Sequence, residues 1–131
     1  MPENVVMKNR IEKFEDVQLL VRSFYNKVLS DDLLGHYFSY VATHHWEKHL
    51  EVLDKFWSNV LFYTGGYEGN ALHTHKMLHH FKGLSTEAFD RWLWLFNQTV
   101  DELFEGEKAA LAKQRVLSIA TVMQVKMARG N

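Results

Sequence analysis

The chain has 131 residues and a mass of 15.4 kDa, which is the size of one globular domain. Apolar residues make up 47% of it and aromatic residues 14%, enough to build a core, so a disordered chain is excluded. The formal net charge of -1 gives no electrostatic basis for binding nucleic acid or an anionic membrane. The absence of cysteine excludes a disulfide scaffold, thiolate metal sites and a cysteine nucleophile.

No segment of the sequence indicates membrane insertion or secretion. The longest apolar run, Trp92 to Phe96, is too short to span a bilayer, and the N-terminus is polar. Pro2 is the only proline, so long helices are permitted everywhere after it. We therefore expect a cytoplasmic protein with an N-terminal lead-in over residues 1–10 and a single domain over residues 11–131.

The first half of the chain shows apolar residues at helical spacing in two long segments. Asp16 is the expected N-cap of the first helix, which should stop near Ser30-Asp31-Asp32 and bury Val17, Leu20, Val21, Phe24 and Val28. A short helical piece through Leu33 and Leu34 is expected to end at Gly35. The second long helix should close at Thr64-Gly65-Gly66, with a stripe formed by Trp46, Leu50, Leu53, Trp57 and Val60.

Two more helical segments follow residues 65–84. Ser85 is the expected N-cap of the third helix, whose stripe carries Phe89, Trp92, Phe96 and Leu103. The fourth starts around Gly106 and Glu107 and carries Ala112, Val116, Ile119, Ala120, Met123 and Met127. Trp57 and Trp94 are expected to be packing residues. The order of segments predicts an all-α domain built from two antiparallel helix pairs.

Histidine is the residue type that needs explanation. The chain has eight, most of them in two clusters, His44-His45-x-x-x-His49 and His73-x-His75-x-x-x-His79-His80. His45 and His49 are four residues apart, as are His75 and His79, so each pair would share a helix face and could hold a metal. No HExxH or Glu-x-x-His motif supports a zinc protease or a di-iron bundle.

Several ordered motifs together resemble the truncated haemoglobins of the third group. The resemblance covers nearly the whole chain after about residue 11. The motifs are Phe24-Tyr25-Asn26-Lys27-Val28, Trp46-x-x-His49, Phe56-Trp57, Tyr67-x-Gly69-Asn70, Leu72-x-x-His75-x-x-Leu78 and Phe89-Asp90-Arg91-Trp92-Leu93.

This resemblance implies a globin-like two-over-two helical sandwich around a haem (haem b, with its iron). His75 matches the proximal ligand of the iron, and His79 is the competing candidate. Tyr25, His49 and Trp92 match the distal side, where a gas ligand would lie, and Phe38 matches an aromatic residue that packs on the haem face.

The chemistry of these residue types suits that role. A porphyrin needs a wide apolar slot, for which the candidate lining residues are Phe24, Phe38, Leu53, Phe56, Leu72 and Leu78. Bound dioxygen carries partial negative charge, which the Tyr25 hydroxyl and the Trp92 indole N–H could stabilise by donation. His49 could swing between pocket and solvent and gate ligand entry, with a pH dependence near its ordinary pKa of about 6.5.

The sequence therefore predicts a haem protein that binds dioxygen and other diatomic ligands such as NO or CO. Redox chemistry on oxygen, NO or peroxide would require a reductase partner, and whether the protein is a carrier, a sensor or an enzyme stays open. Neither nucleic acid nor a membrane is an expected partner. Two alternatives stay open as well: a non-haem, histidine-ligated metal protein, and a helical interaction module whose histidines only titrate near neutral pH.

Overall fold

The computed structural model describes residues 8–44, 46–62 and 84–128. Over these ranges the chain is helical, and its only extended pairing is an isolated bridge between Asn9 and Phe104. The all-α prediction is therefore confirmed. The helices are α1 (Phe14–Ser30), α2 (Gly35–His44), α3 (Trp46–Phe62), α5 (Thr86–Leu103) and α6 (Glu107–Ala128). None of the helices in these ranges is both long enough and apolar enough to cross a membrane.

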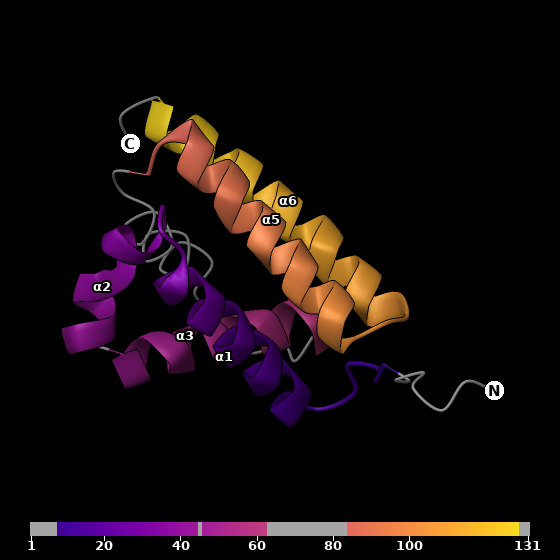
Figure 1. Ribbon diagram of the computed structural model, residues 1–131. Helices are drawn as coiled ribbons and strands as arrows, with labels where there is room; N and C mark the ends of the chain where they lie inside the picture. The colour runs from indigo at the N-terminus through magenta and orange to yellow at the C-terminus, as the bar shows by residue number, and fades with distance from the viewer. Residues whose placement is uncertain (1–7, 45, 63–83, 129–131) are drawn as a thin grey trace, which may run out of the picture.

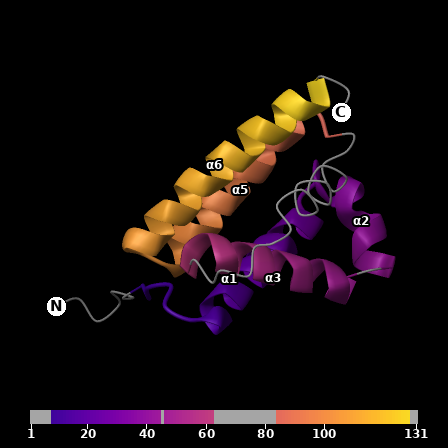
Figure 2. The same ribbon diagram turned by 180° about the vertical axis from the view of Figure 1, so that it is seen from behind.

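The helices form two layers, as Figure 1 shows. Helices α5 and α6 lie side by side as an antiparallel pair, and α1 and α3 form the second layer beneath them, with α2 beside the C-terminal end of α1. The view from behind in Figure 2 shows the same two layers. Because α1 contacts α2, α3 and α5, it is the central helix of the fold. This arrangement confirms the expected two-over-two sandwich.

The helical stripes seen in the sequence form the core between the layers. Burial of each large apolar side chain contributes roughly 1.5–3 kcal/mol to folding. Trp57 packs in the core as expected, stacked on Phe96 with ring centroids 4.9 Å apart. The largest side chains that are fully buried are Phe24, Phe38, Phe89, Phe96, Leu20, Leu34, Leu53 and Leu61.

The ends of two helices test the capping predictions. The Ser85 hydroxyl accepts a hydrogen bond from the Ala88 backbone N–H at 3.1 Å, which confirms Ser85 as the N-cap of α5. Asp16 is not the N-cap of α1, because the helix begins at Phe14, two residues earlier. Instead the Asp16 carboxylate reaches back and accepts from the backbone N–H groups of Glu12 and Lys13, at 2.9 and 3.1 Å.

Helix α2 corrects the prediction for the segment after α1. Gly35 does not end a short helical piece but begins a helix of ten residues. A Cβ atom at Gly35 would lie 2.8 Å from the carbonyl oxygen of Leu29, so the chain needs glycine there for close approach of two backbones. A glycine required by a tertiary contact looks the same in sequence as a glycine that terminates a helix.

The corner between α5 and α6 also holds the N-terminal end of the described chain. The Glu105 backbone N–H donates to the Asn9 carbonyl at 3.0 Å, and Ile11 is buried in the core. Gly106 has φ +98°, a backbone conformation that glycine adopts without strain. Asn9 and Arg10, expected in the lead-in, thus contact the domain, whereas the domain boundary itself stays a prediction.

Candidate functional site

The described residues expected on the distal side come together from separate helices. Tyr25 lies on α1, Phe38 on α2, His49 on α3 and Trp92 on α5. All but His49 are buried, and His49 is half-buried. The fold therefore gathers at one place four residues that the sequence separates by up to 67 positions (92 minus 25).

Tyr25 is the centre of this cluster. Its ring meets the His49 ring edge-on, with centroids 5.2 Å apart and an interplanar angle of 90°. Phe24 lies at 4.8 Å, and Phe38 and Trp46 each lie at 6.1 Å, all with edge-to-face geometry. Such pairs stabilise a packed core beyond the area that they bury. Aromatic rings from two other helices, α2 and α3, and its own neighbour Phe24 thus fix the position of the phenol ring.

Burial keeps the Tyr25 phenol in its neutral form. Removal from water raises the pKa of its hydroxyl well above the ordinary value, and the neighbouring Trp92 side chain opposes that rise only in part. The Trp92 indole N–H can only donate, whereas a phenol hydroxyl can both donate and accept. Tyr25 is therefore a neutral hydrogen-bond donor at every physiological pH.

His49 is also neutral in this setting. Burial lowers the pKa of its imidazole to about 4, because the charged form loses its hydration. The predicted titration near pH 6.5 is therefore wrong for the inward position seen here: partial burial, invisible in the sequence, moves it to more acidic pH. At neutral pH His49 is an uncharged polar side chain beside Tyr25.

The described candidate lining residues, Phe24, Phe38, Leu53 and Phe56, are all buried. Phe24 meets the Trp92 ring at 5.4 Å and the Phe96 ring at 5.1 Å, each edge-on. Leu53 and Phe56, on α3, are 2% and 6% exposed. Whether each of them touches a porphyrin stays a prediction.

The proximal side of the predicted site lies outside the described residues. Leu72, His75 and Leu78 all fall in the range 63–83, as does the competing ligand His79. The assignment of His75 as the iron ligand therefore stays a prediction from the sequence.

Trp46 is a neighbour of the site that sequence reasoning did not assign. Its ring lies 6.1 Å from the rings of both Tyr25 and His49. The signal for it was present, because Trp46 precedes His49 by three residues and residues at that spacing share a helix face.

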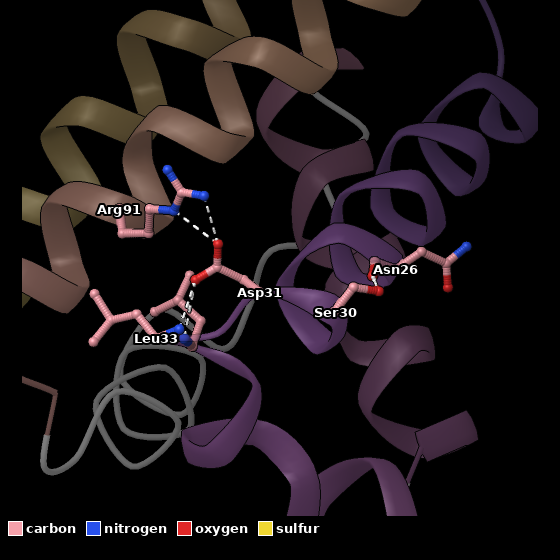
Figure 3. A network of polar contacts seen from close by, with 6 residues as sticks. Asn26, Ser30, Asp31, Leu33 and Arg91 are labelled. Carbon is pink, nitrogen blue, oxygen red and sulfur yellow. Dashed lines mark hydrogen bonds and ion pairs between the residues drawn. The ribbon is translucent and has the colours of Figure 1, made fainter.

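Two ion pairs that join the site helices were also missed. The buried Asp54 carboxylate on α3 accepts from Arg22 Nη1 on α1, with both oxygens at 3.1 Å. Burial raises the pKa of Asp54, and Arg22 partly opposes that shift. The second pair joins Asp31, at the end of α1, to Arg91 on α5, as Figure 3 shows. Neither pair has a sequence signal, since its partners are 32 and 60 residues apart.

The chemistry of the cluster fits one face of a haem pocket. It offers neutral donors against an aromatic wall, which suits a small ligand with partial negative charge. Within the described ranges, no group of three or more His, Cys, Asp or Glu side chains could hold a metal ion directly. The fold and the site together define a small helical globin with polar side chains among aromatic rings on its distal side.

The comparisons with known proteins agree. No model of a protein family matches the chain. The chain is 30% identical over 113 residues to "Group 3 truncated hemoglobin ctb" of Campylobacter jejuni, an alignment that covers 84% of this chain and 87% of that protein. The crystal structure of a group III truncated haemoglobin from Campylobacter jejuni matches with a TM-score of 0.75 and 28% identity, over 90% of this chain and 93% of that one.

The chain belongs to the group III truncated haemoglobin family. Membership of this family implies haem as the cofactor and a gas as the ligand. The haem interpretation therefore replaces the two alternatives that the sequence left open, the non-haem metal protein and the interaction module.

The lowered pKa of His49 predicts how stability depends on pH. Between its unfolded value near 6.5 and its folded value of about 4, the unfolded chain binds the extra proton, so stability falls as the pH falls through this window. Between pH 7 and pH 4.5 the free energy of unfolding should therefore fall by about 2 kcal/mol less in His49→Leu than in the wild type. Urea unfolding of both proteins at matched haem content measures the difference.

His36→Leu on the exposed surface of α2 is the control for this experiment. It should leave the wild-type pH profile in place. Identical profiles for wild type and His49→Leu would show that His49 is not buried in the neutral form.

Proposed function

We propose that this protein binds dioxygen, and also NO and CO, at a haem iron held by His75, with Tyr25 and Trp92 on the ligand side. The haem iron, when bound, supplies the coordination position for the gas. Hydrogen-bond donors of the protein then hold the bound gas. The observation that carries the proposal is the buried, neutral Tyr25 side chain, which lies beside Trp92 and whose ring contacts the His49 ring.

In this proposal Trp92 acts on the Tyr25 hydroxyl, and the Tyr25 hydroxyl acts on the ligand. Donation from the Trp92 N–H to the Tyr25 oxygen would polarise the phenol and make its O–H a better donor to a ligand. A buried hydrogen bond of this kind contributes roughly 0.5–1.5 kcal/mol, and more when the acceptor carries charge. Dioxygen draws more negative charge than carbon monoxide, so the pocket favours dioxygen. The aromatic wall excludes water that would compete for the same proton.

Slow ligand release suits redox chemistry better than oxygen transport. Affinity differences between related complexes lie mostly in the dissociation rate, so donors on the ligand lengthen its stay in the pocket. We infer reaction of bound oxygen with NO, or reduction of peroxide, in place of bulk carriage. Such turnover requires a reductase to return the iron to its ferrous state. The reductase, like the cytoplasmic location, stays a prediction from the sequence.

Replacing Tyr25 by Phe tests the donor. The variant keeps the ring and its edge-on contacts but removes the hydroxyl, so oxygen affinity should fall about tenfold, which corresponds to about 1.4 kcal/mol. Most of the change should be faster oxygen release. Stopped-flow measurement of oxygen and carbon monoxide dissociation gives both rates, and carbon monoxide should change less.

Tyr37→Phe on the exposed surface of α2 is the matched control, since it removes a hydroxyl outside the cluster. Equal effects of Tyr25→Phe on the two gases would mean that Tyr25 acts through shape and not by donation. Because Trp92 lies beside Tyr25, a double-mutant cycle with Trp92→Phe separates the two contributions.

Replacing His75 by Gly tests the proximal ligand. The variant should lose the five-coordinate ferrous spectrum, and added imidazole should restore it by entering the vacated space. His79→Gly should keep the wild-type spectrum. The opposite result, loss with His79→Gly and a normal spectrum with His75→Gly, would assign His79 as the ligand.

A further inference from the structure

The two donors of the proposed site lie on different helices, so their alignment depends on what holds α1 and α5 together. Tyr25 is on α1 and Trp92 is on α5. Arg91 immediately precedes Trp92, and Asp31 is the C-cap of α1, six residues after Tyr25. The ion pair between Arg91 and Asp31 therefore joins the two helices next to the donor on α5.

Asp31 is bound on both of its oxygens. Oδ1 accepts from Arg91 Nε and lies 2.7 Å from both Nε and Nη2. Oδ2 accepts from the backbone N–H groups of Leu33 and Leu34, each at 3.1 Å. Figure 3 shows Arg91 reaching Asp31 from α5 while the Leu33 backbone meets it from the other side. The Asp31 side chain is 5% exposed and the Arg91 side chain 43% exposed, so solvent reaches the contact only from the arginine side.

The charge balance keeps this contact intact. Burial alone would raise the pKa of Asp31, but the hydrogen bonds from Arg91, Leu34 and Leu33 and the Arg91 charge lower it below its ordinary value. The carboxylate is therefore ionised at neutral pH, and two guanidinium nitrogens lie against its Oδ1, an arrangement that a lysine cannot reproduce.

Arg91 is held on a second side by Trp94. Its guanidinium carbon lies 4.7 Å from the centre of the Trp94 ring, within the range of a cation–π contact. Trp94, expected to be a packing residue, is 50% exposed. Its ring serves as a platform for Arg91 and not as filling for the core. Contacts with Asp31 and Trp94 together leave the Arg91 side chain little freedom.

Among the described residues, the other two ion pairs of α1 do not join it to α5 at a residue next to Trp92. Lys27 on α1 pairs with Glu102 on α5, but the Glu102 side chain is 52% exposed and lies ten residues after Trp92. The Arg22–Asp54 pair joins α1 to α3 and does not involve α5. The Asp31–Arg91 contact is thus the one of these three that is placed to set the position of Trp92.

We propose that Arg91 is a positioning residue for the ligand pocket: by joining the first turns of α5 to Asp31, it sets the Trp92 indole against the Tyr25 hydroxyl. The inference rests on the proposed function of these two donors. It assigns a role in ligand chemistry to a side chain whose contacts are with Asp31 and Trp94, outside the distal cluster. Without Arg91 the core contact of Trp92 with Phe24 persists, but the direction of the indole N–H is less well fixed.

The experiment compares Arg91→Gln with Glu102→Gln in the carbon monoxide complex, which is diamagnetic and gives sharp NMR signals. Hydrogen exchange of the Trp92 indole N–H, assigned with Trp92→Phe, reports the donor directly. The C–O stretching band reports the field that the donors exert on the ligand. Arg91→Gln should speed the indole exchange tenfold or more and broaden or split the C–O band. Glu102→Gln should match the wild type in both.

Backbone exchange in α6 separates this effect from a general loss of stability. If Arg91→Gln and Glu102→Gln behave alike, or if α6 amides exchange faster by the same factor as the Trp92 indole, the proposal is overturned. Arg91→Lys covers the case in which Arg91→Gln does not fold. It keeps the positive charge but cannot place two nitrogens against Asp31. Its Trp92 indole exchange rate and its C–O band should therefore lie between those of the wild type and those expected when the contact is lost. Wild-type exchange and an unshifted band in Arg91→Lys would then overturn it.

The same measurements distinguish a failure of the proposed function. If Tyr25→Phe leaves the C–O band unshifted, the donors do not act on the ligand, whatever the indole exchange shows. If Tyr25→Phe shifts the band and Arg91→Gln changes neither readout, the proposed function holds and the positioning role does not.

Discussion

A hydroxyl group buried among aromatic rings costs free energy unless it finds a hydrogen-bond partner, and Tyr25 is such a group. It lies beside the Trp92 side chain, among aromatic rings and a neutral His49. The rest of the structure serves to hold this hydroxyl in place. Helix α1 carries it at the centre of the fold, where it is packed against α2, α3 and α5.

Rigid support of the pocket comes from polar contacts as well as from packing. Aromatic edge-to-face pairs fix the rings, but their energies are small and tolerant of direction. Ion pairs such as Asp31–Arg91 and Arg22–Asp54 are more directional, and each places a buried carboxylate between helices that bear a pocket residue. Removal of one partner would leave the other as an unpaired, partly buried charge. Positioning of the donors and stability of the fold are thus coupled.

Local patterns in the sequence predicted the helices well where the helix ends have local causes. Ser85 caps α5 because its own side chain meets a backbone group three residues on, and the stripe from Phe89 to Phe96 is buried as its spacing indicates. The convergence of Tyr25, His49 and Trp92 came from the family resemblance. Features with tertiary causes were missed: Gly35 is needed by the carbonyl of Leu29, and Asp31 and Arg91 are 60 residues apart. The acidic pKa of His49 also depends on burial that no spacing reveals.

The central claim is that the Tyr25 proton is donated to the gas ligand. The most direct measurement is the ligand-stretching band of the dioxygen complex, recorded by resonance Raman spectroscopy in H2O and in D2O. A direct hydrogen bond predicts a shift of this band on deuteration in the wild type that disappears in Tyr25→Phe. A band that is insensitive to deuteration in the wild type, or that shifts equally in both proteins, would contradict the account.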